Sequence, residues 1–137
     1  MADDDLAARP GCFDGVIPPV IATCAADGTP NVTHLSQLHL VDADHVAVSN
    51  QFFGKTSANV ADNGHAAVLV TDSQTFDTLQ LHLRFERTET SGPLFDALKA
   101  EIDAIASLMR MEGVFGLQGA DVYRVVAVHT VSAGRRS

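Results

Sequence analysis

Residues 49–59 carry most of the side chains whose types and spacing could hold a ligand: Ser-Asn-Gln-Phe-Phe-Gly-Lys-Thr-Ser-Ala-Asn. A strand pattern ends at Ser49 and Asn50, and Lys55 and Thr56 stand at the start of a helical pattern. The first turn of a helix presents unpaired N–H groups and a positive dipole end, which favour an anion. Lys55 would add a point charge. The stretch therefore predicts an anion site, with a solvated lysine and a simple helix cap as the alternative.

Six histidines are the other side chains that could do chemistry at neutral pH: His34, His39, His45, His65, His82 and His129. They lack the HExxH and Cys/His pair spacings of zinc sites, so we predict no metal site. The two cysteines also lack metal-ligand spacing and are predicted to be reduced thiols, with a disulfide as the alternative. No Gly-x-Ser-x-Gly motif occurs, which argues against a serine hydrolase.

The first half of the chain reads as strands that would position these residues. A polar arm over 1–14 precedes an apolar strand over 20–25, and Asp27-Gly28 forms the turn of a hairpin. The returning segment runs as one extended strand from Pro30 to Val41, and a third strand spans 45–50. These segments predict an antiparallel meander.

The second half alternates helices and strands. Helical spacing over 54–63 ends at Gly64, a typical C-cap, and an apolar strand follows over 66–71. Strict alternation predicts strands over 78–89 and 121–132, with an amphipathic helix from Pro93 to Gly113 between them. The order β-β-β-α-β-β-α-β with hairpin connections predicts a mainly β fold, a small six-stranded antiparallel barrel with two helices.

Composition excludes several classes of partner. The formal net charge is −8 and no basic stripe exists, so we expect no binding to nucleic acid or anionic membrane. The N-terminus is acidic where a secretory signal would be basic, and no segment is apolar over the ~20 residues of a membrane span. We therefore expect a cytoplasmic protein.

From residue 46 onward the chain resembles the FMN-binding split barrels of the pyridoxamine 5'-phosphate oxidase superfamily. In that family a strand, a Lys-containing turn, a helix and an Asn-Pro-like turn precede a buried strand. Here these parts read Val46-Ala-Val-Ser-Asn, Lys55-Thr-Ser-Ala-Asn-Val, Asp62-Asn-Gly-His and Ala66-Ala-Val-Leu-Val. The hairpin over 21–32 and the strand after Gly119 also resemble the family, so the likeness covers roughly residues 15–132. It implies a split barrel that works as a homodimer, with the cofactor between protomers.

The resemblance also implies which residues bind FMN. Lys55 and Thr56 would hold the phosphate. The other implied positions lie on neighbouring strands: His34, Ser36, Gln37, Ser49, Asn50 and Gln80. The domains would be an arm (1–14), a split-barrel flavin-binding domain (15–132) and a disordered tail (133–137).

The sequence departs from the family at positions that matter. Family members with strong flavin binding often carry Arg beside the Lys and on the second strand, where this chain has Gly54 and Thr33 or His34. The C-terminal Arg and His of true pyridoxamine phosphate oxidases are also missing. Deazaflavin and haem therefore remain alternative cofactors, haem with an unassigned histidine ligand.

Three functions follow from the resemblance. The first is an FMN-dependent oxidoreductase of unknown small-molecule substrate, in which catalytic residues are unknown and His34 and His82 are candidate proton carriers. The second is a noncatalytic module that binds flavin or haem as a sensor or store. The third is a structural dimer whose cofactor site has decayed.

Overall fold

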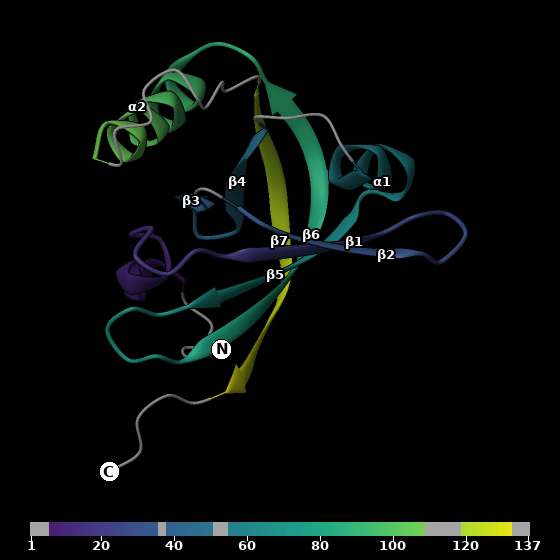
Figure 1. The fold of residues 1–137 in the computed structure, drawn as a ribbon, viewed down its shortest axis with the longest axis horizontal. Coiled ribbons are helices and arrows are strands. Elements are labelled where there is room, and N and C mark those ends of the chain that lie inside the picture. Colours follow the sequence, from purple (N-terminus) through teal and green to yellow (C-terminus); the bar gives the residue numbers. More distant parts are fainter. Residues whose placement is uncertain (1–5, 36–37, 51–54, 109–118, 133–137) are drawn as a thin grey trace.

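Seven antiparallel strands and two helices form the protein, seen in a computed structural model that describes residues 6–35, 38–50, 55–108 and 119–132 (Figure 1). Two short 3-10 helices, Leu6–Ala8 and Pro10–Cys12, come first. The longer elements are β1 (Val20–Cys24), β2 (Pro30–His34), β3 (Leu38–Asp42), β4 (His45–Asn50), α1 (Lys55–Asn63), β5 (His65–Thr71), β6 (Thr78–Glu89), α2 (Pro93–Leu108) and β7 (Gly119–Ser132). The strands form one sheet in the order β2-β1-β5-β6-β7-β4-β3.

The predicted single strand from Pro30 to Val41 is wrong, and the sheet therefore has seven strands rather than six. β2 pairs with β1, and β3 pairs with β4. These pairs lie at opposite edges of the sheet order, so the chain crosses from one edge to the other after Leu35. The alternation of apolar residues along a strand does not depend on which strand it pairs with. It therefore could not show that the segment from Pro30 to Val41 divides into two strands.

The other predicted elements are confirmed to within a few residues. β6 has the predicted bounds, and α1 begins one residue later than expected. Gly64 ends α1 with a φ of 76°, the left-handed conformation of a glycine C-cap. α2 begins at Pro93 as predicted, whereas the predicted end at Gly113 lies outside the described residues.

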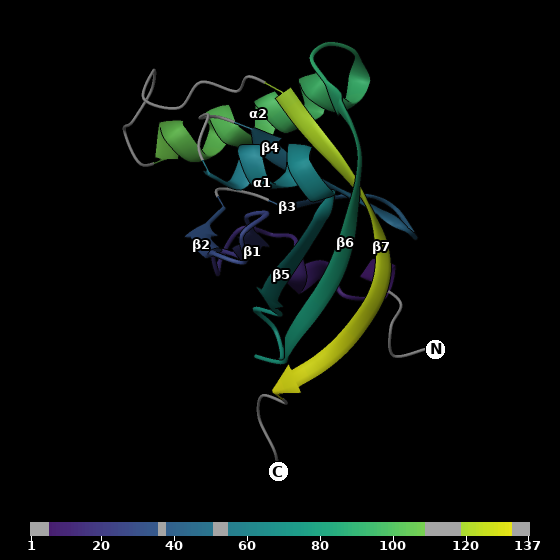
Figure 2. The same cartoon turned by 90° about the vertical axis from the view of Figure 1, so that its right-hand side faces the viewer.

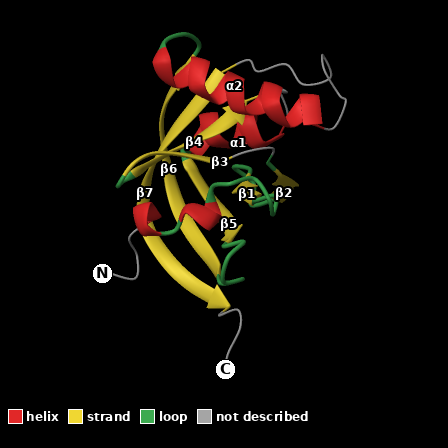
Figure 3. Ribbon diagram, turned by 90° about the vertical axis from the view of Figure 1, so that its left-hand side faces the viewer, coloured by secondary structure: helices red, strands yellow, loops and turns green. Residues whose placement is uncertain are grey.

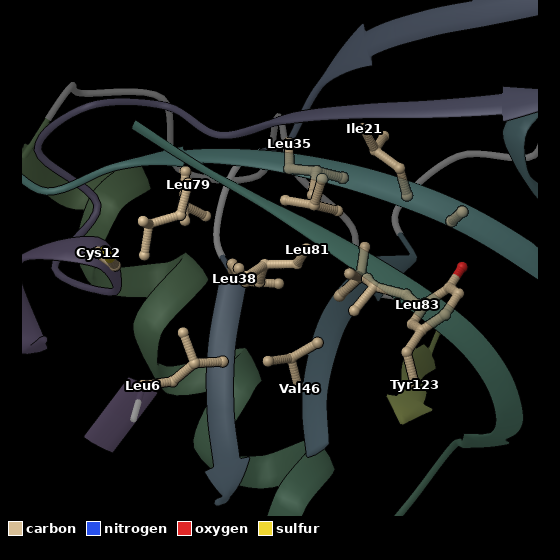
Figure 4. Close-up of a cluster of buried hydrophobic side chains, with 14 of the residues drawn as sticks. Leu6, Cys12, Ile21, Leu35, Leu38, Val46, Leu79, Leu81, Leu83 and Tyr123 are labelled. Atoms are coloured by element: carbon tan, nitrogen blue, oxygen red, sulfur yellow. The ribbon is translucent and has the colours of Figure 1, made fainter. Parts of the chain in front are cut away.

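Alternating strand residues fill the interior of the sheet (Figure 4). The predicted inward face of β6 is confirmed, because Leu79, Leu81 and Leu83 are buried while His82 and Arg84 are exposed. The remaining interior residues come from the arm, five other strands, the residue after β2 and α1: Leu6, Cys12, Ile21, Leu35, Leu38, Val46, Val48, Val60, Ala66, Val68, Val70 and Tyr123.

α2 forms a second layer outside this interior and packs against β7 (Figure 3). Its buried stripe is Leu98, Ile102 and Ala106. On the strands, Ala47 and Val122 are paired and buried, on the face opposite to the interior residues of β4 and β7. β4 is thus buried on both faces from Val46 to Ser49.

The N-terminal arm lies against the core (Figure 3). Leu6 is only 1% exposed. The Arg9 Nη1 atom lies 3.5 Å from Asp72 Oδ2 and 3.2 Å from Asp77 Oδ2, beside the β5–β6 connection. Cys12 and Cys24 are both free thiols, and burial raises the pKa of the Cys12 thiol to about 11.

Candidate functional site

The end of β4 and the start of α1 form the first part of the candidate site. Ser49 and Asn50 are the last two residues of β4, paired across to the first residues of β7. Ser49 is buried. Lys55 is the first residue of α1, and the five chain steps from Asn50 allow a separation of at most roughly 18 Å. The side chains of Asn50, Lys55 and Thr56 lie outside the described residues.

Two asparagines fix α1 on the β1–β2 hairpin. Asn59 Nδ2 donates to Thr23 Oγ1 at 3.0 Å, with both residues buried, and Asn63 Nδ2 donates to the Cys24 carbonyl at 2.8 Å. Val60, between them, lies in the interior. The first turn of α1 contains no acidic residue that would compete for its N–H groups. The start of α1 therefore fits an anionic group such as a phosphate.

Cross-strand pairing places two other predicted site residues in one row. The row runs through five strands: His34, Val20, Leu69, Gln80 and His129. Directly paired residues share one face of a sheet, and Gln80 alternates with buried leucines, so the row faces outward. His34 on β2 and Gln80 on β6 thus share the outside of the sheet, with β1 and β5 between them. Ser36 and Gln37 lie outside the described residues.

A parallel row runs beside the first, and three of its members, Ala22, Ala67 and His82, line a groove of about 480 Å³ on the same side. Its paired members are small or apolar except for one histidine: Val32, Ala22, Ala67, His82 and Ala127. Val126 is an extra residue of β7 at this point and also lines the groove. We call these two rows, with Val126, the outer sheet face. The groove has no signature in the sequence, because Ala22 and Ala67 become neighbours only when β1 pairs with β5.

The imidazole of His82 has two close neighbours on this face. Its Nε2 atom lies 2.7 Å from Gln80 Nε2, and its ring lies 5.3 Å from the ring of His129 in an edge-on arrangement. An amide N–H can donate to Nε2 only when that nitrogen is unprotonated. The described residues include no cluster of three or more His, Cys, Asp or Glu side chains that could hold a metal ion.

The sheet order, with its two edges joined by one crossing segment, defines a split barrel. A family model, Pyridoxamine 5'-phosphate oxidase, matches residues 18–129. The chain belongs to the pyridoxamine 5'-phosphate oxidase-like family of FMN-binding split barrels.

Solved structures share this fold at low sequence identity. An FMN-binding protein from Syntrophomonas wolfei subsp. wolfei is 20% identical with a TM-score of 0.76, covering 98% of this chain and 90% of that one. HupZ from Group A Streptococcus is also 20% identical, with a TM-score of 0.68 and coverage of 96% and 97%. An F420 reductase is 16% identical, with a TM-score of 0.64 and coverage of 88% and 95%. No curated protein matches the chain.

A separate finding concerns membranes. Within the described part of the chain, neither helix has the length and apolar character needed to cross a bilayer.

Proposed function

We propose that the chain is an FMN-dependent oxidoreductase that acts on a small molecule. The observation that carries the proposal is the start of α1, which lacks acidic residues and follows the buried end of β4. Lys55 and Thr56 would bind the FMN phosphate there, with Ser49 and Asn50 beside it. His34, Ser36, Gln37 and Gln80 would line the rest of the cofactor.

Bound FMN would supply the redox chemistry by taking a hydride from the substrate. The chain's own residues would bind and orient the two molecules and keep bulk water from them. The imidazoles of His34 and His82 are the candidates for carrying the accompanying proton, because both lie on the outer sheet face.

The oxidoreductase would act as a homodimer with its cofactor between the two protomers. Support comes from the outward position of His34 and Gln80 on the outer sheet face. A cofactor on that face would remain open to water without a second protein surface.

A deazaflavin is the competing cofactor, since an F420 reductase has the same fold. FMN and F420 share a phosphate next to a polyol chain and a three-ring system, so the start of α1 suits either. Binding without turnover would instead favour the noncatalytic module.

The test is a fluorescence titration of the purified protein with FMN, and separately with F420, for wild type and Lys55→Ala. Loss of the phosphate contact should weaken FMN binding about tenfold or more, since hydrogen bonds to charged groups contribute about 1.5–3 kcal/mol. Lys99→Ala is the matched control, because Lys99 is exposed on α2 and paired with Asp103. That variant should bind FMN like wild type.

Three results would count against parts of the proposal. No binding of FMN by the wild type would overturn it. Equal loss in both lysine variants would show a general charge effect rather than a phosphate site. Tight binding without oxidation of NADH, NADPH or any tested donor would leave a flavin carrier in place of an oxidoreductase.

A further inference from the structure

Four basic residues form one cross-strand row on the outside of the sheet. His65 on β5 pairs with Arg84 on β6, and Arg84 pairs with Arg124 on β7. Arg124 also pairs with His45 on β4. Figure 2 shows β6 and β7 side by side along the near side of the molecule. Directly paired residues share one face, and Arg84 follows the buried Leu83, so the row faces outward. We call these four residues the basic row.

The two arginines of the basic row differ from the other cations whose side chains the structure describes. Arg9, Arg87 and Lys99 each form an ion pair with a carboxylate. Within the described ranges, no ion pair includes Arg84 or Arg124. Like charges directly opposite each other destabilise a sheet, because their Cβ atoms are only about 5 Å apart. A chain with a formal net charge of −8 thus holds two uncompensated positive charges side by side.

The histidines at the two ends of the basic row have different surroundings. His65 Nε2 lies 3.4 Å from Arg84 Nη1, and it can only accept there, because a guanidinium group has no acceptor. His45 is engaged by Asp42 on one ring nitrogen and by Glu86 on the other. The part of the row that is open to an added anion is therefore its two arginines with His65.

This open part borders the groove of about 480 Å³ on the outer sheet face, and His65 belongs to both. The apolar lining of the groove includes Ala67, Leu83 and Val126, while Asn63 and His82 add polar atoms. Its volume lies within the range of ~300–1,000 Å³ that is usual for small-molecule sites. A ligand that joins an anionic group to an apolar body therefore matches the chemistry of both parts.

We propose that the basic row binds the phosphate or carboxylate group of a small molecule whose apolar part lies in the groove. Guanidinium groups present planar sets of N–H donors that match the oxygens of such groups. The site is separate from the proposed FMN phosphate site, because Lys55 begins α1 and His65 follows its end. The nine residues of α1 span roughly 13 Å. The inference goes beyond the proposed function and holds whether or not FMN binds.

Isothermal titration calorimetry of the full chain tests the proposal at about pH 8, where unperturbed imidazoles are neutral. The probes are phenyl phosphate, benzoate, inorganic phosphate and phenol. The wild type should bind phenyl phosphate or benzoate about fivefold or more tightly than inorganic phosphate or phenol, because only the first two join an anion to an apolar body. The tighter of these two probes identifies the anionic group.

Arginine variants test the basic row itself. Arg84→Gln and Arg124→Gln should each weaken binding of the tighter probe about fivefold or more, since each removes charged donors from the site. Arg87→Gln is the matched control, because Arg87 lies on the same strand as Arg84 but is paired with Glu86 and Glu89. It loses the same charge and should bind the probe like wild type. Thermal unfolding without probe checks that each variant is folded.

Two further variants locate the ligand. Ala67→Leu narrows the groove, so it should weaken binding of phenyl phosphate and benzoate and leave inorganic phosphate unchanged. Lys55→Ala should bind the probes like wild type, and the two arginine variants of the row should bind FMN like wild type. The two anion sites are thus tested apart from each other.

Several results would overturn the proposal. Probe binding that is lost in Lys55→Ala and kept in Arg84→Gln and Arg124→Gln would place the anion at the start of α1. Equal losses in all three arginine variants would show a general charge effect, and a wild type that binds none of the probes would exclude the site. An Ala67→Leu variant that binds every probe like wild type overturns the role of the groove. Probe binding without FMN binding overturns the FMN proposal alone.

Discussion

His45 is bound at both nitrogens of its ring. Nδ1 lies 2.9 Å from Asp42 Oδ1, and Nε2 lies 3.2 Å from Glu86 Oε1. The hydrogen bond to Asp42 is the main cause that raises the pKa of His45, and Glu86 adds to it. The Asp44 backbone N–H, and then His45, lower the pKa of Asp42. One side chain thus ties the β3–β4 turn to β6.

The sign of this shift predicts how stability depends on pH. A raised pKa means that the folded state holds the proton more tightly, so the stabilisation is present at low pH and disappears as the pH rises through the raised value. His45→Gln should therefore lower the free energy of unfolding more at about pH 6 than at about pH 8.5. Urea denaturation at both values measures the difference, and the effect should shrink in high salt. An equal loss at both pH values would contradict a charged His45.

At the scale of elements, the position of α1 depends on a buried hydrogen bond between side chains. Asn59 and Thr23 are each 6% exposed, and their bond joins the middle of α1 to β1. Removal of one partner leaves the other buried without its bond, which costs about 1–3 kcal/mol. This bond thus supports, from a turn away, the anion site that we propose at the start of α1.

We predict that Asn59→Ala lowers the free energy of unfolding by about 1–3 kcal/mol and weakens FMN binding. Asn63→Ala is the matched control, because its bond to the Cys24 carbonyl is exposed and its loss should cost less. Urea unfolding and FMN titration of both variants measure the two effects. Equal losses in the two variants would show that burial of the Asn59 bond is unimportant.

At the scale of the whole molecule, the arm docks onto the β5–β6 connection through a close approach at Gly11. Its carbonyl accepts a hydrogen bond from the Ser73 N–H at 3.0 Å. A Cβ at this position would lie 2.2 Å from Asp72 Oδ1, the side chain whose other oxygen contacts Arg9. Only glycine lets the arm lie this close to the barrel.

Gly11→Ala should therefore destabilise the fold by about 1–3 kcal/mol, the usual cost of overpacking a tight contact. Thermal unfolding measures the loss. Ala43→Ser, in the exposed β3–β4 turn, is the comparison and should change stability by no more than about 0.5 kcal/mol. A Gly11→Ala protein as stable as wild type would mean that the arm is not held at this point.

Most of the secondary structure, and the inward side of β6, could be predicted from local sequence alone. Alternation along β6 identified its inward leucines, and glycine and proline marked the ends of α1 and the start of α2, because these signals depend on neighbouring residues only. The same local signals identified the family, which the match over residues 18–129 confirms. The individual cofactor residues stay predictions.

Which strands are neighbours could be seen only in the folded chain. The break between β2 and β3 depends on two different partners at opposite sheet edges, and the groove depends on Ala22 and Ala67 meeting across β1 and β5. The burial of Leu6 and the contact of Gly11 with Asp72 join residues far apart in the chain. Periodicity reports the face on which a residue lies. Which residues share that face is a matter of pairing between distant segments, and local sequence does not encode it.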